Sequence, residues 1–292
     1  MKIKNFTKGI LSSSFGSFWW GFLGTYYFKY IAFIGTVEVV AHRSIWTCII
    51  LLLTTTVFKK WNSFLSVFKN KKKILILFIT SVLIFSNWTI WIYAVETNHI
   101  IDASFGYFIF PIISVLLGFL FLNEKLNFKR ILSILLVSVA TLYLFFNQVS
   151  FPWLGIGVSL IWSTYNLLRK KINVETDIGL LIESLFILPL VIILFYFVLQ
   201  SNQNDFSTSN FNLMLMIFLA GPMTVIPLFF YVKGVELSGL GPSGMIFFIA
   251  PTGQFLLGFF YFNEPFSSQK FLSFILIWIA VSIYLKDLYE TN

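Results

Sequence analysis

Long apolar runs, separated by short polar or basic segments, fill this sequence from end to end. A helix that crosses the hydrocarbon core of a bilayer needs about 20 mostly apolar residues. Ten runs of about this length lie at residues 9–29, 36–57, 74–95, 103–122, 131–147, 152–168, 178–199, 212–232, 242–262 and 270–286. The sequence therefore predicts an all-α integral membrane protein with ten transmembrane helices.

The composition agrees with lipid as the main solvent. Hydrophobic residues make up 58% of the chain and charged residues only 11%, whereas about a quarter of the residues in a soluble domain are charged. A water-soluble fold cannot bury this much apolar surface. The single cysteine, Cys48, excludes a disulfide framework and a cysteine metal site.

Basic residues predict the orientation in the membrane. Of the 20 lysines and arginines, 17 fall on one side of the predicted spans, and the exceptions are Lys29, Arg43 and Lys270. Because cytoplasmic loops are enriched in Lys and Arg, both termini are predicted to be cytoplasmic. The net charge of +8 is therefore a topology signal, and no nucleic-acid partner is expected.

The sequence also contains an internal repeat. A shift of 140 residues aligns positions 94–133 with 234–273 and gives 13 identities in 40 positions without a gap. The matches include Val95-Glu96 with Val235-Glu236, Pro111 with Pro251, Leu116–Phe119 with Leu256–Phe259, and Asn123-Glu124 with Asn263-Glu264. Identity at one fixed spacing indicates two copies of one structural unit.

Each copy holds five predicted spans, in residues 1–147 and 148–292. An odd number of crossings forces the second copy to enter the membrane upside down. The charges agree, because six lysines follow the second span while its counterpart, residues 200–211, has none. The sequence therefore predicts one membrane domain of two inverted five-helix repeats, an architecture typical of secondary transporters.

A binding site is predicted between the halves. Pro111 and Pro251 lie near the middle of spans four and nine, and paired helix interruptions in two repeats indicate a midplane site. Ordinary helix curvature is the alternative. Aromatic and amide side chains inside the spans complete this prediction, because an amide deep in a span needs a partner within the bundle. The predicted substrate-binding residues are Trp46, Asn87, Trp88, Tyr107, Pro111, Asn166, Pro251 and Gln254.

Ionisable residues inside spans indicate function because they are expensive in lipid. Arg43 is predicted about 10 Å below the outer boundary, and Glu183 at a similar depth on the opposite side, so the two should not pair. We expect one ionic cluster at each mouth, closed in alternation. The outer cluster would join Arg43 to Glu38, Glu96 and Lys29, and the inner one Glu183 to Arg169, Lys233 and Glu236. Snorkelling of Arg43, a helix-end role for Glu183 and a helix-packing role for His42 are the alternatives. The predicted gating or ion-pair residues are Lys29, His42, Arg43, Glu96, Arg169, Glu183 and Glu236.

Catalytic signatures are missing from the sequence. It has no phosphate-binding glycine loop, no paired-histidine zinc motif and no Gly-x-Ser-x-Gly elbow. Neither a cofactor nor an enzymatic reaction is therefore expected.

Seven short motifs are distributed along the chain: Ala41–Trp46, Asn87-Trp88, Ala103–Phe108, Leu122–Lys125, Leu168–Lys171, Leu181–Leu185 and Ala250–Thr252. They resemble motifs of the RarD-type permeases, in the EamA branch of the drug/metabolite transporter superfamily. The resemblance runs nearly end to end. It implies ten helices in two inverted repeats, a bacterial cytoplasmic membrane and a permease role. Such permeases are sometimes labelled for chloramphenicol, but no motif here identifies a substrate.

The sequence thus favours a secondary transporter of small organic metabolites or drugs that works by alternating access. A lipid flippase or an accessory membrane subunit is the first alternative, and a membrane-embedded enzyme is a weaker one. A cleft open to lipid would favour the flippase. The sequence does not indicate the substrate, the direction, the coupling ion, or whether the protein is a monomer or a homodimer.

Overall fold

The structure is a computed structural model that describes residues 2–97, 100–147, 151–201, 204–206, 210–263 and 268–291. Its described part is helical throughout and contains no strand. The first rod consists of α1 (Lys2–Trp19), a π-helical turn (Trp20–Gly24) and α2 (Thr25–Tyr30). The rest of the first half comprises α3 (Thr36–Val57), α4 (Trp61–Phe68), α5 (Lys71–Glu96), α6 (Ile100–Leu122) and α7 (Phe128–Phe146).

The second half follows the same order of long helices. It comprises α8 (Trp153–Ile172), α9 (Thr176–Gln200), α10 (Phe211–Phe218), α11 (Ala220–Ser238), α12 (Leu240–Ile246), α13 (Ile249–Phe260) and α14 (Ser268–Thr291). Four helices of the first half, α3, α5, α6 and α7, have a counterpart, α9, α10, α12 and α14, that begins 140 residues later.

Eight helical stretches of the described chain are long and apolar enough to cross a membrane. They cover residues 36–57, 71–94, 105–122, 128–146, 176–200, 211–238, 240–260 and 268–291. The predicted spans at 9–29 and 152–168 are not among them. The first is interrupted by the π turn and begins with a lysine-bearing α1, and the second, α8, is rich in Gly, Ser and Trp and ends in three basic residues. The count of ten spans stays a prediction.

The two equivalent prolines sit in different surroundings. Helix α6 continues through Pro111 without a break. Its counterpart is divided, because α12 ends at Ile246 and α13 starts at Ile249. Pro251 is the third residue of α13, where a helical N–H lacks an intrahelical partner in any case, so the proline costs little there. The two sites are therefore not equivalent interruptions.

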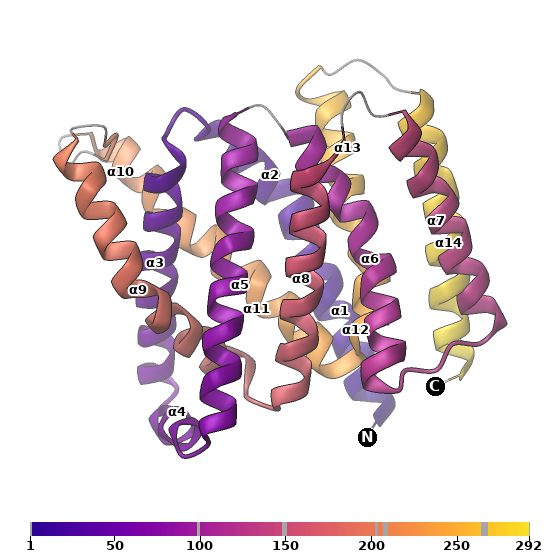
Figure 1. Ribbon diagram of the computed structural model, residues 1–292, viewed down its shortest axis with the longest axis horizontal. Helices are drawn as coiled ribbons and strands as arrows, with labels where there is room; N and C mark the ends of the chain where they lie inside the picture. Colours follow the sequence, from indigo (N-terminus) through magenta and orange to yellow (C-terminus); the bar gives the residue numbers. More distant parts are fainter. Residues whose placement is uncertain are drawn as a thin grey trace.

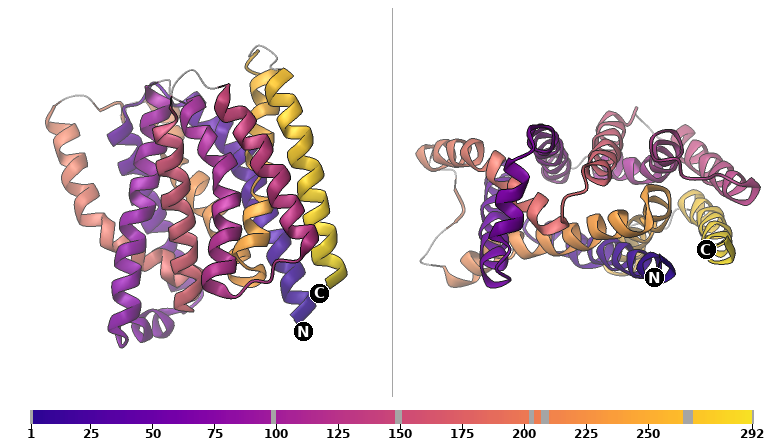
Figure 2. Two further views of the ribbon diagram at one scale, coloured as in Figure 1. Left: turned by 45° about the vertical axis from the view of Figure 1, so that its right-hand side comes forward. Right: turned by 90° about the horizontal axis from the view of Figure 1, so that it is seen from below.

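The helices form two layers (Figures 1 and 2). In Figure 1, α5, α8 and α6 lie in front, and the fainter α11, α1 and α12 lie behind. The view from below in Figure 2 shows the layers edge-on, with α3 and α9 at one end and α7 and α14 at the other. Small residues bring neighbours together: a Cβ at Gly16 of α1 would lie 2.7 Å from Pro227 O of α11.

The start of α1, the end of α14 and the short helix α4 lie at one end of the molecule (Figure 1), called the termini end below. Lys60 Nζ, just before α4, lies 2.9 Å from Glu175 Oε2 and 2.6 Å from Asp177 Oδ2. These contacts join the two halves at the termini end. The hydrogen bond from Lys60 lowers the pKa of Glu175.

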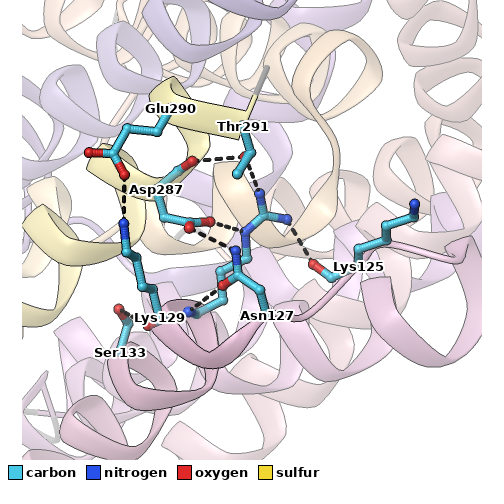
Figure 3. A network of polar contacts seen from close by, with 8 residues as sticks. Lys125, Asn127, Lys129, Ser133, Asp287, Glu290 and Thr291 are labelled. Atoms are coloured by element: carbon cyan, nitrogen blue, oxygen red, sulfur yellow. Dashed lines mark hydrogen bonds and ion pairs between the residues drawn. The ribbon is translucent and has the colours of Figure 1, made fainter.

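A second polar network at the termini end joins the start of α7 to the end of α14 (Figure 3). Arg130 Nε lies 2.8 Å from Asp287 Oδ2, and Asn127 Nδ2 donates to Asp287 Oδ1 at 2.7 Å. Lys129 Nζ lies 2.6 Å from Glu290 Oε2. The network therefore joins α7, the last helix of the first half, to α14, the last helix of the second half.

Candidate functional site

A cavity lies between the two layers of helices, in the part of the molecule away from the termini end. It holds about 630 Å³ of space not filled by protein atoms, the open space at its mouth included. Helices α5, α6 and α8 form one wall, and α3 contributes Arg43. The segment from the π turn to α2, together with Phe247 and α13, forms the other wall. The lining residues are Trp20, Gly24, Thr25, Phe28, Arg43, Ile84, Asn87, Trp88, Trp91, Tyr107, Trp162, Phe247, Ala250 and Gln254.

Aromatic rings make most of the wall and contact one another across the layers. Trp20 and Trp162 meet edge to face with ring centroids 5.6 Å apart. Tyr107 of α6 meets Phe247, which follows α12, at 5.3 Å. Because aromatic side chains supply large, stiff apolar surfaces, this wall suits an organic ligand with a flat apolar body.

Among the described residues that line the cavity, Arg43 alone is charged. It is only 4% exposed, and its guanidinium lies 4.6 Å from the ring centre of Trp88 and 5.0 Å from that of Phe28. Its Nε donates to Thr224 Oγ1 at 3.1 Å, while the buried Nη1 has no hydrogen-bond partner among the described residues. The guanidinium of Arg43 is thus held against two rings, and its Nη1 N–H groups remain able to donate hydrogen bonds to a ligand.

Two further lining residues carry buried polar atoms that no described residue satisfies. They are Trp162 Nε1, a donor, and Gln254 Oε1, an acceptor. Asn87 is held in place, since its Nδ2 donates to Val158 O at 3.2 Å. Buried polar groups normally have partners, so unsatisfied ones around a cavity indicate a ligand or water site.

The sequence model described as the EamA-like transporter family matches residues 7–146. Protein RarD of Salmonella typhi is 31% identical over 292 residues, which cover 100% of this chain and 99% of that protein. The chain belongs to the RarD-type permeases of the EamA family.

Other comparisons agree with this assignment. An uncharacterized transporter of Vibrio cholerae is 31% identical, with 96% of this chain and 92% of that protein covered. A solved crystal structure shares the fold at a TM-score of 0.71 and 13% identity, over 94% of this chain and 95% of its own. This RarD-type permease is thus a multi-pass membrane protein of a transporter family, and its motif-based recognition from sequence is confirmed.

The structure brings four of the predicted substrate-binding residues of the permease together at the cavity: Asn87, Trp88, Tyr107 and Gln254. Trp46, Asn166, Pro111 and Pro251 do not line it. Trp46 packs on Phe218 with ring centroids 4.8 Å apart, and the fully buried Asn166 donates from Nδ2 to Trp162 O at 2.8 Å. A role for any of the eight in substrate binding stays a prediction.

The predicted substrate-binding residues do not include four aromatic residues that line the cavity: Trp20, Phe28, Trp91 and Trp162. A signal for Trp20 and Phe28 existed, because Trp20, Gly24 and Phe28 are four residues apart and so share one helix face. Trp91 likewise lies four residues after Asn87. For Trp91 the interfacial aromatic belt is the competing interpretation, because the belt uses the same residue type.

The inner predicted cluster of the permease is assembled around Glu183. This carboxylate is 2% exposed and accepts hydrogen bonds from Thr80 Oγ1 at 2.6 Å and Tyr165 OH at 3.0 Å. Arg169 Nε lies 3.5 Å from Glu183 Oε1. Thr80 belongs to the first half and Glu183 to the second, so this cluster also joins the halves. Glu236 lies apart from it, with Oε2 accepting from Thr176 Oγ1 at 2.6 Å.

The outer predicted cluster is not assembled around Arg43. Glu38, which we expected near it, accepts from the backbone N–H groups of Asp205 at 2.7 Å and Phe206 at 2.8 Å. Glu96 accepts from the backbone N–H of Thr36 at 3.1 Å and from its hydroxyl.

His42 and Lys29, two further predicted gating or ion-pair residues, also lie against other groups. His42 Nε2 lies 3.9 Å from Glu38 Oε1, and Lys29 Nζ lies 4.0 Å from the ring centre of Phe262. A gating role for either cluster stays a prediction.

Proposed function

We propose that the chain is a secondary transporter that moves small organic metabolites or drugs across the bacterial cytoplasmic membrane, and that the cavity is its substrate site. The cavity carries this proposal, because it combines an aromatic wall with a few unsatisfied polar atoms, as small-molecule sites do. Its residues come from both halves of the chain, so a movement of one half against the other would reshape it.

We further propose ten membrane spans, arranged as two inverted five-helix repeats in residues 1–147 and 148–292. The 140-residue spacing of the helix starts supports this, as does the left-handed backbone of the equivalent Asn123 and Asn263, with φ of 55° and 54°. A matched contact also supports it: the Thr36 hydroxyl donates to Glu96, and the Thr176 hydroxyl, 140 residues later, donates to Glu236. The family match ends at residue 146, where the first repeat would end.

Alternating access follows from this arrangement. The basic residues would place the termini end in the cytoplasm. Contacts between the halves hold the termini end together, by Lys60 with Glu175 and by Thr80 with Glu183. The cavity lies toward the other end, so this conformation has its substrate site on the outer side. If the inverted halves exchange conformations, the site becomes accessible from the cytoplasm.

Reconstitution into proteoliposomes tests this function. The purified permease is first screened for thermal stabilisation by a panel of small aromatic acids, their amides, nucleosides and antibiotics, and the hits are then tested for uptake against protein-free liposomes. We expect at least one compound both to stabilise and to be transported. Scrambling of a fluorescent phospholipid, without solute uptake, would favour the flippase and overturn the proposal.

A further inference from the structure

The chain has three arginines, and Arg43 differs from the other two in its partners. Arg130 Nε lies 2.8 Å from Asp287 Oδ2, and Arg169 Nε lies 3.5 Å from Glu183 Oε1. Arg43 is as deeply buried as Arg169, but no carboxylate of the described residues lies within ion-pair distance of it. A buried charge without a counter-ion is costly, so such a residue needs an explanation.

Neither of the two carboxylates that we expected near Arg43 pairs with it. The carboxylate of Glu38, five residues before Arg43, accepts hydrogen bonds from two backbone N–H groups instead. The carboxylate of Glu96 is engaged by Thr36. The neighbours that Arg43 does have are a hydroxyl and two ring faces, which compensate a charge only in part.

The position of Arg43 makes it available to a ligand. Thr224 fixes its Nε, and the rings of Trp88 and Phe28 hold the guanidinium plane. Nη1 has no hydrogen-bond partner among the described residues, and half of the residues that line the cavity are aromatic. A planar guanidinium with free N–H groups is the side chain best suited to bind an oxyanion, and one held in place loses little entropy on binding.

We propose, on the basis of the transport function above, that the substrate is a small organic anion whose acidic group binds Arg43 and whose flat apolar body packs between the aromatic walls. The ligand supplies the counter-ion that Arg43 does not find among the described side chains. The unsatisfied Trp162 Nε1 and Gln254 Oε1 are placed to bind polar groups elsewhere on the same molecule.

Matched pairs of acids and neutral amides test the charge. The probes are phenylacetate with phenylacetamide and indole-3-acetate with indole-3-acetamide. Phenyl phosphate is added to test a phosphate in place of a carboxylate. Binding to the purified permease is measured by isothermal titration calorimetry, because the indole probes fluoresce in the same band as tryptophan, and transport is measured by uptake into proteoliposomes. We expect each acid that binds to do so about ten- to a hundred-fold more tightly than its amide, because hydrogen bonds between charged groups are worth that much.

Three variants assign the preference to Arg43. Arg43→Gln should abolish the difference between acid and amide, and Arg43→Lys should retain part of it. Lys129→Gln, which removes an equal charge outside the cavity, should leave it unchanged. Thermal unfolding of each variant without ligand separates loss of binding from loss of fold, and the comparison of acid with amide in the unmodified protein stands even if a variant fails to fold.

The outcomes also separate this inference from the transport function. Equal binding of acid and amide, or an acid preference that survives in Arg43→Gln, overturns the inference while transport stands. Uptake of a neutral compound from the wider panel, with no binding of any acid, also overturns the inference and leaves the transport function standing. No binding or uptake of any compound overturns both.

Discussion

Arg43 Nε donates to Thr224 Oγ1 at 3.1 Å, and this bond joins α3 of the first half to α11 of the second. The Thr224 hydroxyl in turn donates to Ala220 O at 2.7 Å. That second bond uses the hydroxyl proton and leaves a lone pair to face Arg43. Thr224 therefore orients the guanidinium group of Arg43 relative to the cavity.

Thr224→Val should destabilise the permease. The valine keeps the shape but leaves the buried Nε of Arg43 without an acceptor, which costs about 1–3 kcal/mol. Thr224→Ser keeps the hydroxyl and should unfold close to the unmodified protein. Thermal unfolding in detergent micelles measures both, and equal stability of the valine and serine variants would mean that the bond is not formed.

The two buried arginines should respond differently to neutralisation. Arg169→Gln leaves Glu183 as a buried carboxylate whose remaining described donors are hydroxyl groups. We therefore expect the free energy of unfolding, measured in detergent micelles, to fall by about 3 kcal/mol. Arg43→Gln leaves no described carboxylate without its partner. We expect it to change the free energy of unfolding by less than about 1 kcal/mol, because the lost ring contacts are offset by a smaller desolvation cost. Equal losses would show that Arg43 is a structural residue.

Single cysteines in a Cys48→Ala background test the topology. With a membrane-impermeant maleimide on intact cells, a cysteine at Asn204 should be labelled, whereas cysteines at Lys71 and Lys170 should be labelled only after the membrane is opened. The reason is the strong excess of basic residues at the termini end. Labelling of the Asn204 position from the cytoplasm would overturn the inverted arrangement.

Lys60→Gln should loosen the termini end. It removes the contacts with Glu175 and Asp177 that bridge the halves. We expect a cysteine at Ser184, which lines a small pocket beside Glu183, to react faster with a small thiol reagent in this variant. Lys129→Gln, which lies at the same end but outside this bridge, is the matched control. An unchanged rate would mean that the bridge does not hold the end closed.

Much of the fold could be predicted from sequence because lipid imposes a simple rule. Each spanning helix needs a long apolar run, and such runs gave helices close to the predicted limits, as at residues 36–57. The π turn at Trp20–Gly24 and the break between α12 and α13 could not be predicted. The equivalent prolines suggested matched interruptions, but a proline breaks a helix only where packing does not accommodate it.

The candidate site was harder to predict, because it depends on which face of each helix points inward. Asn87 and Trp88 reach the cavity, whereas Trp46, three residues after Arg43, turns toward Phe218 instead. The surroundings of Arg43 were also missed. We expected Glu38 and Glu96 as neighbours from their shared depth, but backbone N–H groups and Thr36 engage them first. Depth alone does not fix such pairings.

Blocking the cavity tests most directly whether it is the substrate site. Gly24 lines the cavity, and a Cβ there meets only its own helical segment, at 3.5 Å. Gly157 of α8 has nothing within 4 Å of an added Cβ. We therefore compare Gly24→Leu with Gly157→Leu for uptake of a panel hit into proteoliposomes. We predict that Gly24→Leu abolishes uptake while remaining folded and that Gly157→Leu transports normally. Equal uptake by both variants would contradict the assignment of the cavity as the transport site.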